Sequence, residues 1–340
     1  MSLSIDKYEI LGRLGKGSFG EVLLVRHKHL NRAEAAKIIK THRINEALNE
    51  AKTIQQLQHE HIIQIYDADI LPDKSGIFIT MEYHQQGSIV NLKFISRIHL
   101  VDIAVHILRA LEYAHYRQYI HRDIKPSNIL LDEQGRALLS DFGLSSKMDE
   151  IENSPHYQYM YHQAPEVLLK KEKEGPRTDI YALSVTLHRL INGDPDWLSR
   201  ISFKELEGKI VKGKFPDRAH YRPDIPTTLI KIINKALSLD FKNKRYQSAE
   251  AMRLDIERKV RVKYNWKPKD NRWIARTKNF DIKIETQRKG NQAKIITSNK
   301  RIESERFRRI TKYCFDRINE TEAEDFIRRI ISEIDSSFKT

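Results

Sequence analysis

One polar loop between two apolar segments constrains the fold of this chain more than any other stretch. The loop, residues 121–128, reads His-Arg-Asp-Ile-Lys-Pro-Ser-Asn and lies between Ile120 and the apolar segment 129–131. Apolar anchors on both sides would fix the loop to a core, and a loop held in this way usually presents its polar side chains to a ligand. Asp123, Lys125 and Asn128 are therefore candidate site residues.

Three glycines mark a second candidate site near the start of the chain. Gly15, Gly17 and Gly20 form a G-x-G-x-x-G pattern between two apolar segments that read as strands. Because the second strand is reached at Val22, two residues after the last glycine, the pattern predicts a strand–turn–strand flap instead of the strand-to-helix turn of dinucleotide-binding folds. Glycines let a backbone approach phosphates closely. Alone, the motif also fits a glycine-rich hairpin without a ligand.

A lysine stands inside the next predicted strand, residues 34–39. Lys37 follows Ala35 in a run of small and apolar residues, and a lysine in mid-strand is costly unless it is paired or faces a cleft. Apolar residues at helical spacing then predict a helix over 44–58, which carries Glu50. A glutamate on a helix is ordinarily solvated, and only its register with Lys37 makes Glu50 a candidate partner.

A carboxylate follows a short predicted strand at 137–140. Asp141 begins an Asp-Phe-Gly sequence, and a carboxylate at a strand end suits Mg²⁺, which takes few protein oxygens. Ala-Pro-Glu at 164–166 comes next, and Asp179 begins an apolar helix.

Taken in order, these motifs resemble those of protein kinases over residues 8–257. The polar loop matches the family's catalytic loop, His-Arg-Asp followed by Asn five positions after the aspartate. The resemblance implies an α+β, bilobal protein-kinase fold, with a small β-rich N-lobe over 8–83 and a mainly helical C-lobe over 84–257. It also implies a serine/threonine protein kinase, the class for which Lys125 is typical. Such an enzyme transfers the γ-phosphoryl group of ATP to a protein hydroxyl and would also phosphorylate itself.

The resemblance assigns roles to the candidate residues. Asp123 would accept or orient the proton of the attacking hydroxyl, and Lys125 would neutralise charge on the transferring group. Lys37, held by Glu50, would fix the phosphates. The remaining contacts to ATP would come from the flap, the adenine pocket and the hinge between the lobes: Gly15, Gly17, Gly20, Val22, Ala35, Met81, Glu82 and Tyr83.

Two further roles concern the metal and the loop backbone. Asn128 and Asp141 match the family's Mg²⁺ ligands, and Asp179 matches the aspartate that braces the catalytic loop.

The segment before Ala164 departs from the family. Gln158, Tyr159 and His162 occupy the Gly, Thr and Tyr positions of the usual Gly-Thr-x-x-Tyr-x-Ala-Pro-Glu sequence. The missing threonine normally bonds the catalytic aspartate and lysine, so we expect a narrow or unusual substrate, or a strong dependence of the activity on an activator. The alternative is a catalytically impaired kinase-fold scaffold whose basic C-terminal domain binds a partner or nucleic acid.

Arg122, next to Asp123, raises the question of activation. Kinases with this arginine are often switched on by a phosphate that partners the cation. The alternative is that an acidic residue at 149, 150 or 152 already neutralises it. Candidate phosphorylation sites are Ser145, Ser146, Ser154, Tyr157, Tyr159 and Tyr161.

Charge is unevenly distributed along the chain. The 340 residues carry a formal charge of +14, of which +11 falls on 258–340, with 23 Lys and Arg against 12 Asp and Glu. A basic segment of this kind can bind an anionic partner, either nucleic acid or an acidic protein, or can be a solvated basic face. Arg306, Arg308, Arg309 and Lys312 could bind phosphates, with Trp273 as a stacking surface. The protein substrate and the oligomeric state are not indicated.

Residues 258–340 predict a small ββαα appendage of no recognised family. Its expected parts are a linker at 267–271 between Trp266 and Trp273, a hairpin of strands 280–284 and 293–297, a helix bearing Phe307, Ile310, Cys314 and Ile318, and a second helix over 323–334 begun by a capping box of Thr321 and Glu324.

Cysteine usage and hydropathy suggest a location. The single cysteine, Cys314, rules out an internal disulfide and fits a reducing compartment. No apolar run approaches the ~18 residues needed to span a membrane, and the start of the chain has no apolar core of signal-peptide length. We therefore expect a cytoplasmic protein.

Overall fold

The computed structural model describes residues 7–17, 20–142, 146–147, 160–194 and 201–337. The chain divides into two compact units. The first comprises residues 1–91, 106–183 and 247–250, and the second comprises 92–105, 184–246 and 251–340.

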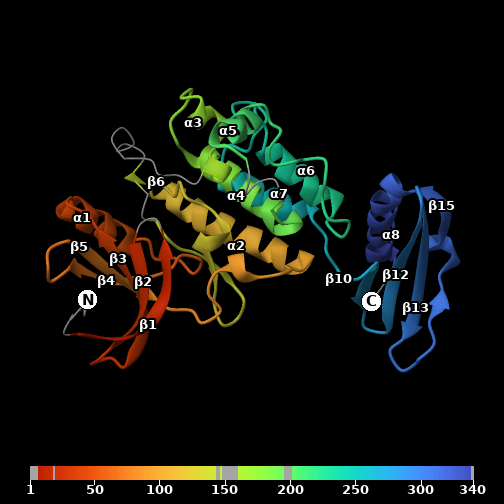
Figure 1. The fold of residues 1–340 in the computed structure, drawn as a ribbon, viewed down its shortest axis with the longest axis horizontal. Helices are drawn as coiled ribbons and strands as arrows, with labels where there is room; N and C mark the ends of the chain where they lie inside the picture. Colours follow the sequence, from red (N-terminus) through yellow and green to blue (C-terminus); the bar gives the residue numbers. More distant parts are fainter. Residues whose placement is uncertain (1–6, 18–19, 143–145, 148–159, 195–200, 338–340) are drawn as a thin grey trace. The chain divides into compact units, whose positions relative to one another are not determined.

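The first unit begins with a five-stranded antiparallel sheet in the order β1-β2-β3-β5-β4 (Figure 1). One helix, α1 (Ile44–Gln55), packs against β4 and β5. The sheet and this helix form the β-rich lobe that the sequence predicts. The strands are β1 (Tyr8–Gly17), β2 (Gly20–His27), β3 (Arg32–Lys40), β4 (Ile65–Ile70) and β5 (Gly76–Glu82).

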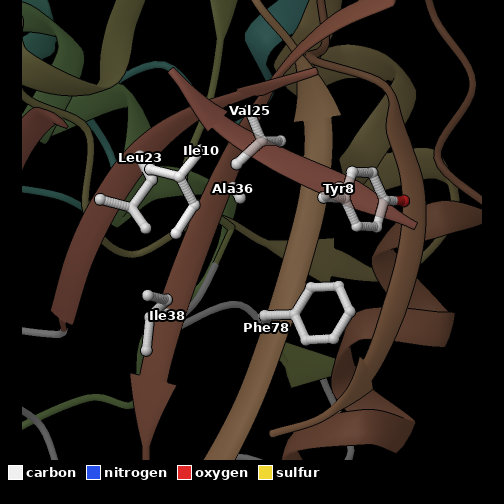
Figure 2. Close-up of a pocket in the computed structure, with 7 residues that line it drawn as sticks. All are labelled: Tyr8, Ile10, Leu23, Val25, Ala36, Ile38 and Phe78. Carbon is white, nitrogen blue, oxygen red and sulfur yellow. The ribbon is translucent and has the colours of Figure 1, made fainter. Parts of the chain in front are cut away.

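One face of this sheet carries a shallow apolar hollow. Figure 2 shows the side chains of Leu23, Val25, Ala36 and Ile38 gathered there, with the hydroxyl of Tyr8 directed away from them. The Tyr8 oxygen lies 3.4 Å from Thr80 Oγ1. The hollow is therefore part of an apolar cluster of this sheet, and its lining directs no polar side-chain group into it that could take part in catalysis.

In the rest of the first unit, the polar loop lies between two short strands. Ile120 ends β6, which pairs with β9, and Ile129 begins β7, which pairs with β8; both isoleucines are fully buried. This arrangement confirms that apolar anchors fix the loop on both sides. The elements are β6 (Tyr119–Ile120), β7 (Ile129–Leu131), β8 (Ala137–Leu139), β9 (Ser146–Lys147) and α3 (Pro165–Leu168), with parts of α2 (Arg97–Tyr116) and α4 (Pro176–Asn192).

The second unit contains the other helices of the predicted C-lobe. Sequence signals set their limits: Ser202 and Glu205 form a capping box at the start of α5. The apolar face of α6 is built from residues at helical spacing and is buried. These helices are α5 (Phe203–Val211), α6 (Thr227–Ala236) and α7 (Ala249–Lys259).

The second unit also contains the appendage, which has six strands and one helix where the sequence predicted two strands and two helices. The strands run in the order β10-β11-β12-β13-β14, with β15 also paired to β13. Figure 1 shows α8 lying along one face of this sheet. The elements are β10 (Trp266–Lys269), β11 (Arg272–Arg276), β12 (Phe280–Lys289), β13 (Gln292–Arg301), β14 (Arg308–Arg309), β15 (Phe315–Asn319) and α8 (Ala323–Ser337).

Two expectations for the appendage are confirmed. The hairpin of β12 and β13 turns where predicted, with Lys289 paired to Gln292. The second helix is α8, although its start differs from the predicted capping box. Asn319 accepts a hydrogen bond from the amide of Thr321 at 3.2 Å and begins a short 3₁₀ turn that leads into the helix.

Two other expectations are wrong. The segment from Phe307 to Ile318 is not a helix, because the exposed edge of β13 pairs with it as β14 and β15. Thr297 of β13 binds this segment through the Ile310 amide at 2.9 Å and the Tyr313 carbonyl at 2.7 Å. Residues 267–271 are not a linker: 267–269 belong to β10, and 270–271 are the turn that leads to β11, with Trp266 fully buried. Among the described residues, no helix is both long and apolar enough to cross a membrane.

Candidate active site

The catalytic loop is braced by Asp179 of α4, as predicted. Its carboxylate accepts hydrogen bonds from the backbone amides of His121 and Arg122, both at 2.8 Å, and lies 2.9 Å from His115 Nε2. Arg122 has a φ of 69°, a conformation that is strained for an L-residue and needs such support. Burial raises the pKa of Asp179, but the bonds and charges of His115 and the loop outweigh it, so the pKa lies below its ordinary value.

His121 joins this loop to the strand that precedes Asp141. Its Nδ1 accepts from the Asp123 amide at 3.2 Å, so Nε2 carries the proton and donates to the Ser140 carbonyl at 3.0 Å. The ring is fully buried, and burial holds the pKa of His121 below its usual value. This positioning role was not predicted. Only the position of His121 in the motif could have indicated it.

Asp123 is held on one side by two neighbours. Its Oδ2 accepts from Lys125 Nζ at 2.7 Å and from Asn128 Nδ2 at 2.9 Å. Asn128 Nδ2 also donates to the backbone carbonyl of Asp123 at 2.8 Å. Within the described part of the chain, Asp123 Oδ1 has no hydrogen-bond or ion-pair partner, so this oxygen can receive a proton from a bound hydroxyl.

Lys37 and Asp141 meet although 104 positions separate them. The lysine ammonium of β3 contacts the Asp141 carboxylate, and its side chain is 9% exposed. Burial raises the pKa of Asp141, but the charge and the hydrogen bond of Lys37 have the larger effect. The pKa therefore lies below its ordinary value, and the carboxylate stays ionised at neutral pH. Asp141 has a φ of 67°, which turns the chain away from its strand. Glu50 lies half-buried on α1.

The predicted ATP-contacting residues lie on neighbouring strands. The β1–β2 hairpin pairs Gly15 with Val22 and Gly17 with Gly20, which confirms the strand–turn–strand flap. On β3, Lys37 is opposite Val22. The tip of the flap, residues 18 and 19, lies outside the described residues.

The predicted hinge residues lie at the end of β5 and directly after it. Met81 is paired with Ala35 of β3, and Tyr83 comes directly after the strand. The amide of Glu82 donates to the Gln64 carbonyl at 3.0 Å. Glu82 therefore cannot give this N–H to a ligand and would bind adenine through its carbonyl.

Asn128 and Asp141 fit a divalent cation. Both amide hydrogens of Asn128 point at Asp123, so its Oδ1 faces elsewhere, with Ser127 Oγ at 3.3 Å. The Ser140 amide donates to the Asn128 carbonyl at 2.9 Å, which places Asp141 beside Asn128. Among the described residues, no cluster of three or more His, Cys, Asp or Glu side chains could enclose a metal. One amide and one carboxylate oxygen suit Mg²⁺, whose other ligands are water and phosphate oxygens.

Arg122 forms a buried ion pair with Glu174, with Nε 3.0 Å from Oε2. The sequence interpretation considered residues 149, 150 and 152 as partners and did not consider Glu174. Those three residues, with Ser145, Ser154, Tyr157, Gln158 and Tyr159, lie outside the described residues. His162, which stands at a tyrosine position of the family, is buried in a 3₁₀ turn (Met160–His162).

Comparisons with known proteins agree with this geometry. Residues 8–255 match the protein kinase domain family. A CBL-interacting serine/threonine-protein kinase 19 from Arabidopsis thaliana is 29% identical over 245 residues, which cover 68% of this chain and 50% of that protein. A carbon catabolite-derepressing protein kinase from Secale cereale is 30% identical over 229 residues, which cover 61% of this chain and 44% of that protein. The chain thus spans about half the length of the curated relatives it matches. It belongs to the protein kinase domain family.

Proposed function

We propose that this chain is an ATP-dependent protein serine/threonine kinase. The observation that carries the proposal is the convergence of Lys37, Asp123, Asn128 and Asp141 on one site from strands and loops far apart in the sequence. Lys125, which binds the catalytic aspartate, and the name of the Arabidopsis thaliana relative favour serine and threonine hydroxyls. The complete set of groups speaks against a catalytically impaired scaffold.

The geometry suggests how each residue contributes. The hydroxyl of the substrate would lie at Asp123 Oδ1 and give it a proton as the oxygen forms a bond to the γ-phosphorus of ATP. The bond from that phosphorus to the β-phosphate oxygen breaks, and ADP leaves. Lys125, 2.7 Å from the same carboxylate, places a positive charge beside the transferring group. Positioning of this kind can supply about 7–11 kcal/mol of the barrier reduction.

Lys37 and the metal ligands would serve the phosphates. The buried ammonium of Lys37 is fixed by Asp141 at the floor of the site, and Glu50 would orient it from α1. Mg²⁺ held by Asn128 and Asp141 would neutralise phosphate charge. Gly15, Gly17 and Gly20 would let the flap backbone approach the phosphates, while Val22, Ala35, Met81, Glu82 and Tyr83 would enclose the adenine.

We propose the same functional division that the sequence suggests: N-lobe 8–83, C-lobe 84–257 and appendage 258–340. The excess of Lys and Arg in the appendage supports an anionic partner for it. The single cysteine supports a cytoplasmic location.

Incubation with radiolabelled ATP and Mg²⁺, beside an Asp141→Asn control, tests the proposal. We expect label on serine or threonine of the chain itself or of an added protein, and no label with the variant. Mapping the labelled residues identifies the hydroxyl class. Equal labelling by Asp141→Asn, or label on tyrosine alone, would contradict the assignment.

A further inference from the structure

The appendage sheet has one covered face and one open face. The covered face packs against α8, with Trp266, Ile282, Ile284 and Ile295 in one apolar core with Ile331. Side chains alternate between the two faces along each strand. The residues on either side of these buried positions therefore point to the open face.

Strand registers identify what the open face carries. No bulge interrupts β10 to β13, so same-face residues can be read directly across the pairs Lys267–Ile274, Ile274–Lys283 and Lys283–Ser298. The pairing of Ser298 with Arg309 extends this row to β14. We call this open side the basic face, because its cations are Lys267, Lys269, Arg272, Arg276, Lys283, Lys289, Lys294, Lys300 and Arg309.

The carboxylates on this face do not balance its cations. Asp281 is held by Arg276 at 2.7 Å, and Glu285 by Arg272 at 3.0 Å and Lys283 at 2.7 Å. The hydrogen bond from Arg276 keeps the pKa of Asp281 below its ordinary value, so it remains charged and matched. In the described part of the chain, the cations Lys267, Lys269, Lys289 and Arg309 have no ion-pair partner. Positive charge therefore remains across the whole width of the sheet.

An aromatic ring lies among these cations. Phe307 is 38% exposed, and Lys283 Nζ and Lys300 Nζ lie 4.8 Å and 5.6 Å from its ring centroid. The ring expected from the sequence, Trp273, instead packs against the core on the covered side. Likewise Lys312 contacts Glu333 of α8. The aromatic residue of the basic face is therefore Phe307.

Starting from the anionic partner proposed above for the appendage, we propose that the basic face binds single-stranded nucleic acid. Neighbouring strands are about 4.8 Å apart, so the cations form a two-dimensional array that can follow a flexible phosphate backbone. Phe307 and the half-buried Ile274 and Ile296 supply apolar surface for unstacked bases. A face that extends over five paired strands is wider than the helix or two-stranded ribbon that the major groove of a duplex admits. An acidic polypeptide would use the cations but not the ring.

Binding of the full-length chain to a fluorescein-labelled oligouridine and to the corresponding oligothymidine, measured by anisotropy over a salt series, tests the proposal. We expect affinity to fall steeply with salt for RNA, DNA or both. The double variant Lys267→Gln/Lys269→Gln should bind about tenfold more weakly and flatten the log–log salt slope by about 1.4, since each lost phosphate contact removes about 0.7. The control Lys212→Gln/Lys231→Gln removes the same charge from exposed positions outside the appendage and should change affinity less than about twofold.

Phe307→Leu separates stacking from charge. It should weaken binding about fivefold or more while leaving the salt slope unchanged, because base stacking is not salt-dependent in the way that phosphate contacts are. Absence of binding at the lowest salt, or equal weakening by both lysine pairs, would overturn the proposal. Binding of polyglutamate in place of both oligonucleotides would also overturn it, while leaving an anionic partner in place. Phosphoryl transfer assayed on the same preparations tests the kinase assignment separately.

Discussion

Arg122 and Glu174 form an ion pair that is almost fully withdrawn from water. Their side chains are 0% and 4% exposed, with Nε 3.0 Å from Oε2. The pair ties the catalytic loop, at the residue before Asp123, to the segment just before α4. We therefore predict that Glu174 supplies the negative charge that a phosphate in the activation segment supplies in kinases switched on through this arginine.

Phosphatase treatment should consequently leave catalytic activity unchanged. We expect the dephosphorylated chain to retain its rate in a radiolabelled ATP assay, because the charge of Arg122 is already matched within the fold. Glu174→Gln should lower both activity and stability, with a loss of about 3–5 kcal/mol in the free energy of unfolding from urea titration, since it removes one charge of a buried ion pair. Glu60→Gln, at a 60% exposed carboxylate, is the matched control. A phosphatase-treated protein without activity would show that Glu174 does not replace the phosphate.

The hydrogen bonds from Asp179 to the loop backbone lead to a second prediction. In Asp179→Asn one acceptor oxygen becomes an NH₂ group that faces a backbone N–H, either that of His121 or that of Arg122. We expect the turnover rate to fall by about two orders of magnitude, a loss within the range that proton transfer contributes, because Asp123 loses its orientation. Unfolding should become easier by about 1–3 kcal/mol.

Nucleotide binding distinguishes this positioning role from general unfolding. ATP affinity of Asp179→Asn, measured by calorimetry, should stay close to that of wild type, since Lys37 and the flap are untouched. Asp194→Asn is the control. It removes the same charge from a 47% exposed carboxylate that is paired with Arg189 and lies just after α4. Wild-type turnover in Asp179→Asn would exclude the bracing role.

What the sequence could predict depended on how local the signal was. The catalytic loop holds Asp123, Lys125 and Asn128 within six positions, and the structure brings these three side chains into hydrogen-bond contact. The β12–β13 hairpin was also foreseen, because alternation and a glycine turn are local signals. Pairing of Arg122 with Glu174 spans 52 positions, and no local pattern distinguishes Glu174 from other acidic residues.

The error in the appendage has a related cause. The apolar residues from Phe307 to Ile318 recur at three- and four-residue intervals, which is a helical pattern by itself. The free edge of β13 offers backbone hydrogen bonds and an apolar face, and this tertiary pairing overrides the local preference. The expected role of Trp273 was wrong for a similar reason, since the register of β11 against β12 decides which face its side chain occupies.

His61 leads to a prediction about pH. It is 2% exposed, stacks on His106 at 4.2 Å between ring centroids, and has its Nδ1 3.1 Å from the Ala137 carbonyl. Burial lowers the pKa of His61 to about 4, and the unfolded value is about 6.5. Above pH 6.5 the ring is neutral in both states. Between pH 6.5 and 4 the unfolded chain takes the proton first, so stability falls by up to about 1.4 kcal/mol per pH unit.

Urea titrations at several pH values between 7.5 and 5 measure this slope. Burial also lowers the pKa of His59, His106 and His121, so their contributions have the same sign. His61→Gln, which keeps an amide donor for Ala137, should lose less stability on acidification than wild type. Parallel slopes for the two proteins would show that His61 does not titrate differently on unfolding.

Arg97 leads to the last prediction, which concerns how the appendage is attached. Its guanidinium is 1% exposed and donates to the Tyr264 carbonyl at 2.7 Å, the Asp224 carbonyl at 3.2 Å and the Asp335 carboxylate of α8 at 2.7 Å. Arg328 of α8 reinforces the attachment by donating to backbone carbonyls of 221–225. The planar guanidinium of an arginine can donate to three separate acceptors at once, whereas the compact ammonium group of a lysine cannot reach all three.

Arg97→Met should therefore destabilise the chain by about 3–5 kcal/mol, because it removes the hydrogen bonds to Asp335 and to the carbonyls of Tyr264 and Asp224. Arg97→Lys should recover less than half of that loss. Arg329→Met, at a 71% exposed arginine of α8, is the matched control and should stay within about 0.5 kcal/mol of wild type. Urea unfolding followed by tryptophan fluorescence measures all three, since the buried Trp266 reports on the appendage core. An Arg97→Met protein as stable as the control would mean that the hydrogen bonds of Arg97 do not hold the appendage.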